Sequence, residues 1–146
     1  TIVCSENKIL GKPKSKKEAI LMLKKLSNKQ HKVVTAITIK TTQKEISFHE
    51  TTIVHFKKLS MKEIVFYVNN FKPLDKAGGY GIQEWIGLIG VKKINGSYTN
   101  VVGLPSSRLY QELNKFIDCQ LNKFSINFLM DLYSKRLRNL LLQNCL

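Results

Sequence analysis

The chain has 146 residues and few acidic side chains, arginines and cysteines. Only 10 Asp and Glu stand against 24 Lys and Arg, which gives a formal net charge of +14. Such a surface attracts phosphate, so nucleic acid is a partner to consider. However, arginine, whose planar fork reads guanine and clamps backbone phosphates, occurs only at Arg108, Arg136 and Arg138. The composition therefore disfavours a nucleic-acid-binding protein.

Long apolar runs and paired cysteines are also missing. No segment approaches the roughly 20 apolar residues of a membrane span, and the first residues do not have the pattern of a signal peptide. Cys4, Cys119 and Cys145 include no C-x-x-C pair and have no histidine at ligand spacing, which favours reduced thiols over a disulfide scaffold or a zinc site. We therefore expect a cytoplasmic protein with no membrane segment and no structural metal.

The hydrophobic pattern predicts a mixed α/β domain. Ser15 with Glu18, and Ser60 with Glu63, have the capping-box spacing that begins a helix. They predict helices over residues 16–26 and from Ser60 to just before Lys72. Strands are expected over residues 1–4, 32–40, 45–56, 91–94 and 97–102, with a tight turn at residues 95–96, the end of the sheet at residues 103–105 and a closing helix over 108–116.

Residues 117–146 have a different character, with scattered Ile, Leu and Phe among Lys, Asn and Arg. We separate them from residues 1–116 as a helical tail without recognisable chemistry. An appended sequence from read-through or a frame change, or a helix on a membrane surface, are the alternatives.

Two familiar phosphate-binding motifs are incomplete, and the P-loop pattern has Glu6 where its first glycine belongs. The run that begins at Gly79 lacks the last glycine of G-x-G-x-x-G, because Glu84 stands there, and no strand immediately precedes it. After Gly11 and Lys12, a P-loop needs Ser or Thr, but Pro13 follows. The three histidines, His31, His49 and His55, are too scattered for a metal triad.

A glycine-rich segment between residues 72 and 105 remains as a candidate ligand site. Its glycines could let backbone amides approach a phosphate ester closely. Asp75, Lys76, Gln83 and Glu84 would supply polar groups, and Tyr80 and Trp85 would supply walls. The alternative is an ordinary glycine-rich connection in which Trp85 belongs to the core and Asp75 and Lys76 form a solvated pair.

The same segment closely resembles the Maf family of nucleoside triphosphate pyrophosphatases. The matching stretches are residues 72–87, KPLDKAGGYGIQEWIG, and residues 96–105, GSYTNVVGLP. Residues 1–3 resemble the end of the family's Ala-Asp-Thr-x-Val strand, and residues 10–13 and 31–35 resemble its following motifs. The resemblance covers residues 1 to about 116 and implies a Maf/ITPase-like fold, which is a mixed, strongly twisted sheet flanked by helices.

The resemblance implies hydrolysis between the α and β phosphates of a nucleoside triphosphate, assisted by a divalent cation, Mg²⁺ or Mn²⁺. Lys12 matches the family's phosphate-contacting lysine. Thr1 and Gln83 match the branch that acts on dTTP and UTP, and a Gln side chain offers both a donor and an acceptor to a uracil or thymine edge. Asp75, Lys76 and Glu84 would border the same cleft. A homodimer is possible for such an enzyme, and the sequence does not decide it.

Several parts of the family pattern do not occur in this chain. These are the Ser-x-Ser-Pro-Arg-Arg loop, an acidic residue and a lysine after it, and the proton-acceptor Asp expected just before Thr1. We therefore expect an N-terminally truncated enzyme whose fold lacks its N-terminal part and which has little or no turnover by itself. Two alternatives stay open, a basic nucleotide- or RNA-binding module without catalysis, and a non-functional remnant whose tail covers exposed core.

Overall fold

The structure is a computed structural model and describes residues 1–42 and 44–116. Its elements are β1 (Ile2–Ser5), β2 (Lys8–Leu10), α1 (Lys16–Leu26), β3 (Gln30–Lys40), β4 (Glu45–Phe56), α2 (Met61–Phe71), the 3-10 turn η1 (Ala77–Gly79), α3 (Trp85–Gly90), β5 (Val91–Asn95), α4 (Tyr98–Val102) and α5 (Ser106–Phe116). The predicted mixed α/β class is confirmed. The tail predicted at 117–146 lies outside the described residues.

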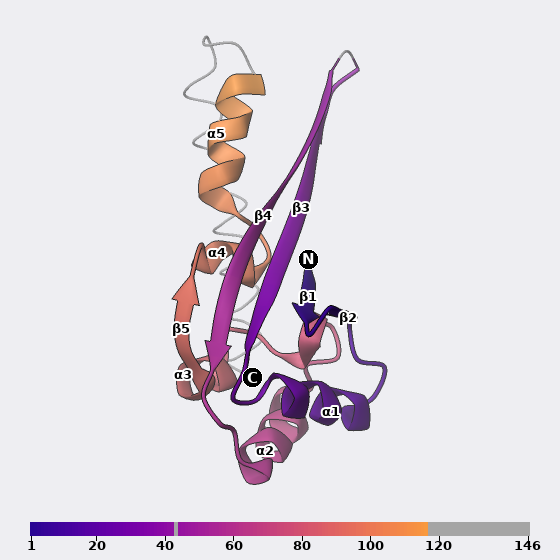
Figure 1. The fold of residues 1–146 in the computed structure, drawn as a ribbon. Coiled ribbons are helices and arrows are strands. Elements are labelled where there is room, and N and C mark those ends of the chain that lie inside the picture. The colour runs from indigo at the N-terminus through magenta and orange to yellow at the C-terminus, as the bar shows by residue number, and fades with distance from the viewer. Residues whose placement is uncertain (43, 117–146) are drawn as a thin grey trace. The chain divides into compact units, whose positions relative to one another are not determined.

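Five strands form one sheet in the order β2-β1-β3-β4-β5 (Figure 1). Strand β1 pairs antiparallel with β2 and with β3, which places Val3 opposite both Leu10 and Val33. Strand β5 pairs antiparallel with β4. The predicted pair β3 and β4 is confirmed as neighbouring strands, and β2 was not predicted because three residues are too few to show alternation.

One face of the sheet and two helices share the hydrophobic core. Alternate residues of the strands point to this face, as the period of two requires. Helices α1 and α2 contribute residues at helical spacing from their apolar sides. The members from these elements are Val3, Val33, Val54 and Phe56 of the strands, Ala19, Leu23 and Leu26 of α1, and Ile64, Tyr67 and Val68 of α2.

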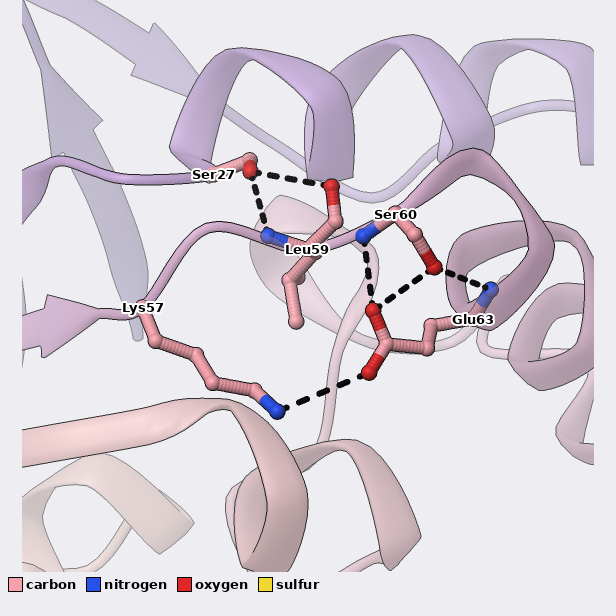
Figure 2. A network of polar contacts seen from close by, with 5 residues as sticks. All are labelled: Ser27, Lys57, Leu59, Ser60 and Glu63. Atoms are coloured by element: carbon pink, nitrogen blue, oxygen red, sulfur yellow. Dashed lines mark hydrogen bonds and ion pairs between the residues drawn. The ribbon is translucent and has the colours of Figure 1, made fainter.

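The capping patterns at Ser15 and Ser60 explain where α1 and α2 begin. The Ser60 hydroxyl accepts from the Glu63 N–H at 3.2 Å, and the Glu63 carboxylate accepts from the Ser60 N–H at 2.6 Å (Figure 2). These bonds satisfy donors that a helix leaves open at its start. Beside them, Ser27 at the end of α1 exchanges hydrogen bonds with the backbone of Leu59, so the two helices are also tied by polar contacts.

The strand predicted over residues 97–102 is wrong, because these residues form helix α4. Ser97 caps this helix by accepting from the Asn100 N–H at 3.2 Å, and Gly103 ends it in a left-handed conformation. The sheet therefore ends at Asn95, not at residues 103–105. The β-prone residues Tyr98 and Val101 misled the prediction, since local propensity yields to tertiary contacts such as those of Asn100.

The chain divides into two compact units. The first comprises residues 1–38 and 47–105 and contains every residue that the sequence predicts for the site. The second comprises the tip of the β3–β4 hairpin and the chain from Ser106 onward, where the Lys44 ammonium lies 4.9 Å from the centre of the Phe116 ring. Within residues 1–42 and 44–116, no helix is long and apolar enough to cross a membrane.

Candidate functional site

The glycine-rich segment is packed against β1 and α1. Gly78 and Gly79 have φ angles of +72° and +73°, a region that favours glycine. A Cβ on Gly78 would lie 3.1 Å from the Val3 side chain, so the turn η1 lies close on β1. The Gly78 N–H donates to the Gly11 carbonyl at 3.0 Å. This bond fixes the exposed loop that carries Lys12 next to η1.

A group of polar side chains surrounds Glu84. The Tyr67 hydroxyl donates to one of its carboxylate oxygens, and the Lys76 ammonium lies 3.0 Å from the other. Lys76 also pairs with Asp75 at 2.9 Å. The Glu84 side chain is 9% exposed and that of Lys76 is 19%, whereas Asp75 is 70% exposed. The structure therefore brings Asp75, Lys76 and Glu84 together and adds Tyr67. We call these four residues the Glu84 cluster.

The charges in the Glu84 cluster are well matched. Burial alone would lower the pKa of Lys76, but hydrogen bonds and charges from Asp75 and Glu84 outweigh it and raise that pKa. Burial, followed by the bond to Glu84, also raises the pKa of Tyr67. Lys76 is thus a cation and Tyr67 a neutral donor at pH 7. Glu84 accepts from both, and these two contacts hold the loop in shape.

Four glycine amides turn inward instead of facing a ligand. The Gly81 N–H donates to the Tyr67 hydroxyl oxygen at 3.0 Å. The N–H groups of Gly78, Gly79 and Gly87 donate to the backbone carbonyls of Gly11, Lys76 and Glu84 at 3.0, 3.0 and 2.8 Å. The prediction that these glycines open the backbone to a phosphate is wrong for these four positions. Their amides stabilise the loop.

The two predicted aromatic walls belong to the packing of the domain. Tyr80 is 5% exposed, and its hydroxyl lies 2.7 Å from Nε2 of the buried His31. Trp85 packs edge-to-face against Phe66 with ring centres 4.9 Å apart and joins the margin of the core. The structure supports the alternative reading of Trp85 as part of the core packing. The Asp75–Lys76 pair of that reading is also present, with Asp75 exposed and Lys76 half-buried.

Gln83 lies on a rigid turn. The Glu84 N–H donates to the Gly81 carbonyl at 3.1 Å, which closes the turn around Gln83. The preceding residue Ile82 is 5% exposed and anchors one side. A Cβ on Gly87 would lie only 1.8 Å from the Ile82 carbonyl oxygen, so helix α3 can approach the turn only because residue 87 is glycine. The half-buried Gln83 is thus held from both sides.

Thr1 is connected to a second buried network. Its hydroxyl lies 2.9 Å from the Thr35 hydroxyl, which in turn donates to the Asn100 carbonyl at 3.2 Å. The Asn100 side chain is fully buried and donates to Thr52 Oγ1 at 2.9 Å, with the Val33 and Glu50 carbonyls each at 3.2 Å. Neither Thr35 nor Asn100 was expected from the sequence to lie near Thr1. The Ser97 cap three residues before Asn100 was the available sign of a helix here.

The three residues expected to contact substrate are therefore held in place by different sets of hydrogen bonds. Lys12 is held through Gly11 and Gly78, Gln83 through the Glu84 cluster, and Thr1 through Thr35. A groove of about 490 Å³ lies elsewhere and is lined by none of these three. Its residues are Cys4, Glu6, Asn7, Lys8, Ile9, Gln30, His31, Lys32 and Ile53.

The sequence also matches known proteins. The sequence profile of the family described as "Maf-like protein" matches residues 1–116. The dTTP/UTP pyrophosphatase of Christiangramia forsetii is 52% identical over 118 residues, which are 81% of this chain and 60% of that protein. Proteins of the same name from Cytophaga hutchinsonii and Flavobacterium psychrophilum are 50% and 54% identical over 127 and 110 residues. These cover 87% and 75% of this chain, and 58% and 56% of those proteins.

The chain thus spans less than two-thirds of the length of these relatives. The profile match includes all the predicted substrate residues, Thr1, Lys12 and Gln83, and the whole Glu84 cluster. On the match of residues 1–116, the chain belongs to the Maf-like protein family.

Proposed function

We propose that this chain is part of a nucleoside triphosphate pyrophosphatase that acts on dTTP and UTP. In this proposal, the residues of the chain select the base and bind the phosphates. The observation that carries the proposal is the fixed backbone turn that bears Gln83, whose neighbours Gly81 and Glu84 are held by contacts with Tyr67 and Lys76. A fixed backbone turn presents the Gln83 side chain, which carries both a donor and an acceptor for a base, from a defined position. The names of the relatives support pyrimidine substrates.

Lys12 and Thr1 complete the proposed contacts. The exposed Lys12 ammonium would pair with the triphosphate, since a lysine acts as a compact point charge towards phosphate. Thr1 would contact the base with its hydroxyl. In the described residues, both carboxylates of the Glu84 cluster are ion-paired with Lys76, so we assign neither of them to the activation of water.

A divalent cation, Mg²⁺ or Mn²⁺, belongs to the proposed reaction, because phosphoanhydride hydrolysis needs charge neutralisation on the triphosphate. The residues at hand do not fit a metal site. Among the described residues, no three His, Cys, Asp or Glu side chains gather closely enough to hold an ion. We therefore assign no step of the reaction to a metal held by these residues.

We place this activity in the cytoplasm, and a homodimer stays a prediction that light scattering can test. The second candidate function is a basic module that binds nucleotides or RNA without catalysis, which the net charge of +14 favours. Salt separates the two. Affinity for RNA that exceeds affinity for UTP and falls steeply with salt would favour the basic module.

The decisive test measures binding of dTTP, UTP and GTP to the chain with Mg²⁺, and the release of pyrophosphate from each. We expect the two pyrimidine nucleotides to bind about tenfold more tightly than GTP, as one well-placed polar contact allows. Replacing Gln83 with Leu should remove this preference, whereas replacing the exposed Gln30, outside the site, should not. Equal affinity of the wild-type chain for UTP and GTP would contradict the proposal.

A further inference from the structure

The groove of about 490 Å³ lies beside the turn that joins β1 to β2. The strand register places Cys4 between Ile9 of β2 and Lys32 of β3. Their chain neighbours Val3 and Val33 belong to the core, and side chains alternate between the two faces of a strand. Cys4, Ile9 and Lys32 therefore lie side by side on the sheet face opposite the core, where they line the groove.

The charge of the groove is positive and unbalanced. Lys8 and Lys32 line it, and neither has an ion-pair partner in the described part of the chain. The acidic residue of the lining, Glu6, is already paired with Lys29 at 2.6 Å. Burial lowers the pKa of His31 to about 4, so this ring adds no charge at pH 7. The groove therefore offers two unpaired ammonium groups to an anion.

The size and the lining of the groove favour a small organic molecule. Its volume lies within the range of about 300–1,000 Å³ that is usual for small-molecule sites. Ile9, which is 67% exposed, and the half-buried Ile53 supply apolar surface. The lining contains no arginine to clamp a nucleic-acid backbone, and no Phe, Tyr or Trp on which a base could stack. Nucleic acid is therefore the less suitable ligand for this groove.

We propose that the groove binds a phosphate monoester of a compact apolar group, at a site separate from that of the nucleotide. A phosphate monoester carries a charge of about −1.5 to −2 at pH 7, which matches the ammonium groups of Lys8 and Lys32. Lysine binds phosphate as a compact point charge. The apolar group covers Ile9 and Ile53 and removes their exposed surface from water. None of the three proposed substrate residues lines the groove, so this inference does not depend on the proposed function.

Calorimetric titration of the full chain with naphthyl phosphate tests the proposal. Naphthol and inorganic phosphate each lack one half of this probe, and we expect both to bind at least about tenfold more weakly. Lys32→Gln should weaken the binding of naphthyl phosphate about tenfold, since it removes one charged contact. Lys92→Gln is the matched control, because it removes the same charge from an exposed position on β5 outside the groove, and it should leave the affinity unchanged.

Amide NMR of the wild-type chain locates the probe without depending on any variant. We expect shift changes at Ile9 and Lys32 that persist in excess UTP. Changes at Lys12 and Gln83, or displacement of the probe by UTP, would place it in the nucleotide site and overturn the inference. Equal weakening by Lys32→Gln and Lys92→Gln would also overturn it, because the positive surface as a whole would then attract the phosphate. So would an RNA oligonucleotide that displaces the probe and binds more tightly.

Discussion

Acidification should destabilise this protein through His31. The His31 ring is 2% exposed and lies edge-on to Phe56 and Tyr80, with ring centres 5.2 and 5.4 Å away. Burial, and secondly the charge of His55, lowers the pKa of His31 from 6.5 to about 4. The native protein therefore keeps this imidazole neutral at a pH where the unfolded chain protonates it.

The sign and size follow from proton linkage. Below pH 6.5 the unfolded state binds a proton that the native state does not, so stability is present above this pH and is lost as the pH falls towards about 4. With these two pKa values, the loss between pH 7 and pH 5 is about 2 kcal/mol, and the full loss below pH 4 is about 3 kcal/mol. The pKa of Glu63 is lowered by the hydrogen bond from the Ser60 backbone N–H.

Urea unfolding at pH 7 and pH 5 measures this loss directly. The wild type should show it, whereas His31→Gln, although less stable at pH 7, should lose much less between the two pH values. His49→Gln is the matched control, because His49 lies exposed on β4. A wild-type protein with the same free energy of unfolding at both pH values would refute the reasoning, as would a His49→Gln variant that loses the pH dependence.

Two further predictions concern the loop around Gln83. Gly87→Ala should destabilise the protein by more than about 3 kcal/mol in urea unfolding, because the new Cβ meets the Ile82 carbonyl, while Gly11→Ala, with open space around it, should change stability by less than about 1 kcal/mol. In a double-mutant cycle, Tyr67→Phe and Glu84→Gln should show a coupling free energy of about 1 kcal/mol, since each removes one end of the same bond. Additive effects of the two changes would contradict the proposed Glu84 cluster.

Local patterns predicted most of the secondary structure. Helices α1 and α2 start at Ser15 and Ser60 as their capping residues indicate, and β4 has the predicted bounds. Helix α4 could not be predicted from its β-prone residues, because it is stabilised by the Asn100 side chain against β3 and β4, a contact across at least 48 residues of chain. Such long-range bonds leave no periodic pattern in the sequence.

The candidate site was predictable to a similar degree. Asp75, Lys76 and Glu84 were expected to border one cleft, and Lys76 is ion-paired with both carboxylates. Tyr67, by contrast, appeared in the sequence only as a core position of α2, and its bond to Glu84 spans 17 residues. The glycines predicted backbone N–H groups that are accessible to a ligand. The hydrogen-bond partner of such a group depends on tertiary contacts, such as that of the Gly81 N–H with the Tyr67 hydroxyl.

The central claim is that Lys12, Gln83 and the start of β1 form one pyrimidine nucleotide site. Titration of ¹⁵N-labelled protein with UTP, followed by amide NMR, tests it most directly. We expect the largest shift changes at the Gln83 side-chain amide and at the backbone amides of Ile2 and Lys12, and much smaller changes with GTP. Changes confined to the groove around Lys8 and Lys32, or equal changes with UTP and GTP, would contradict the account.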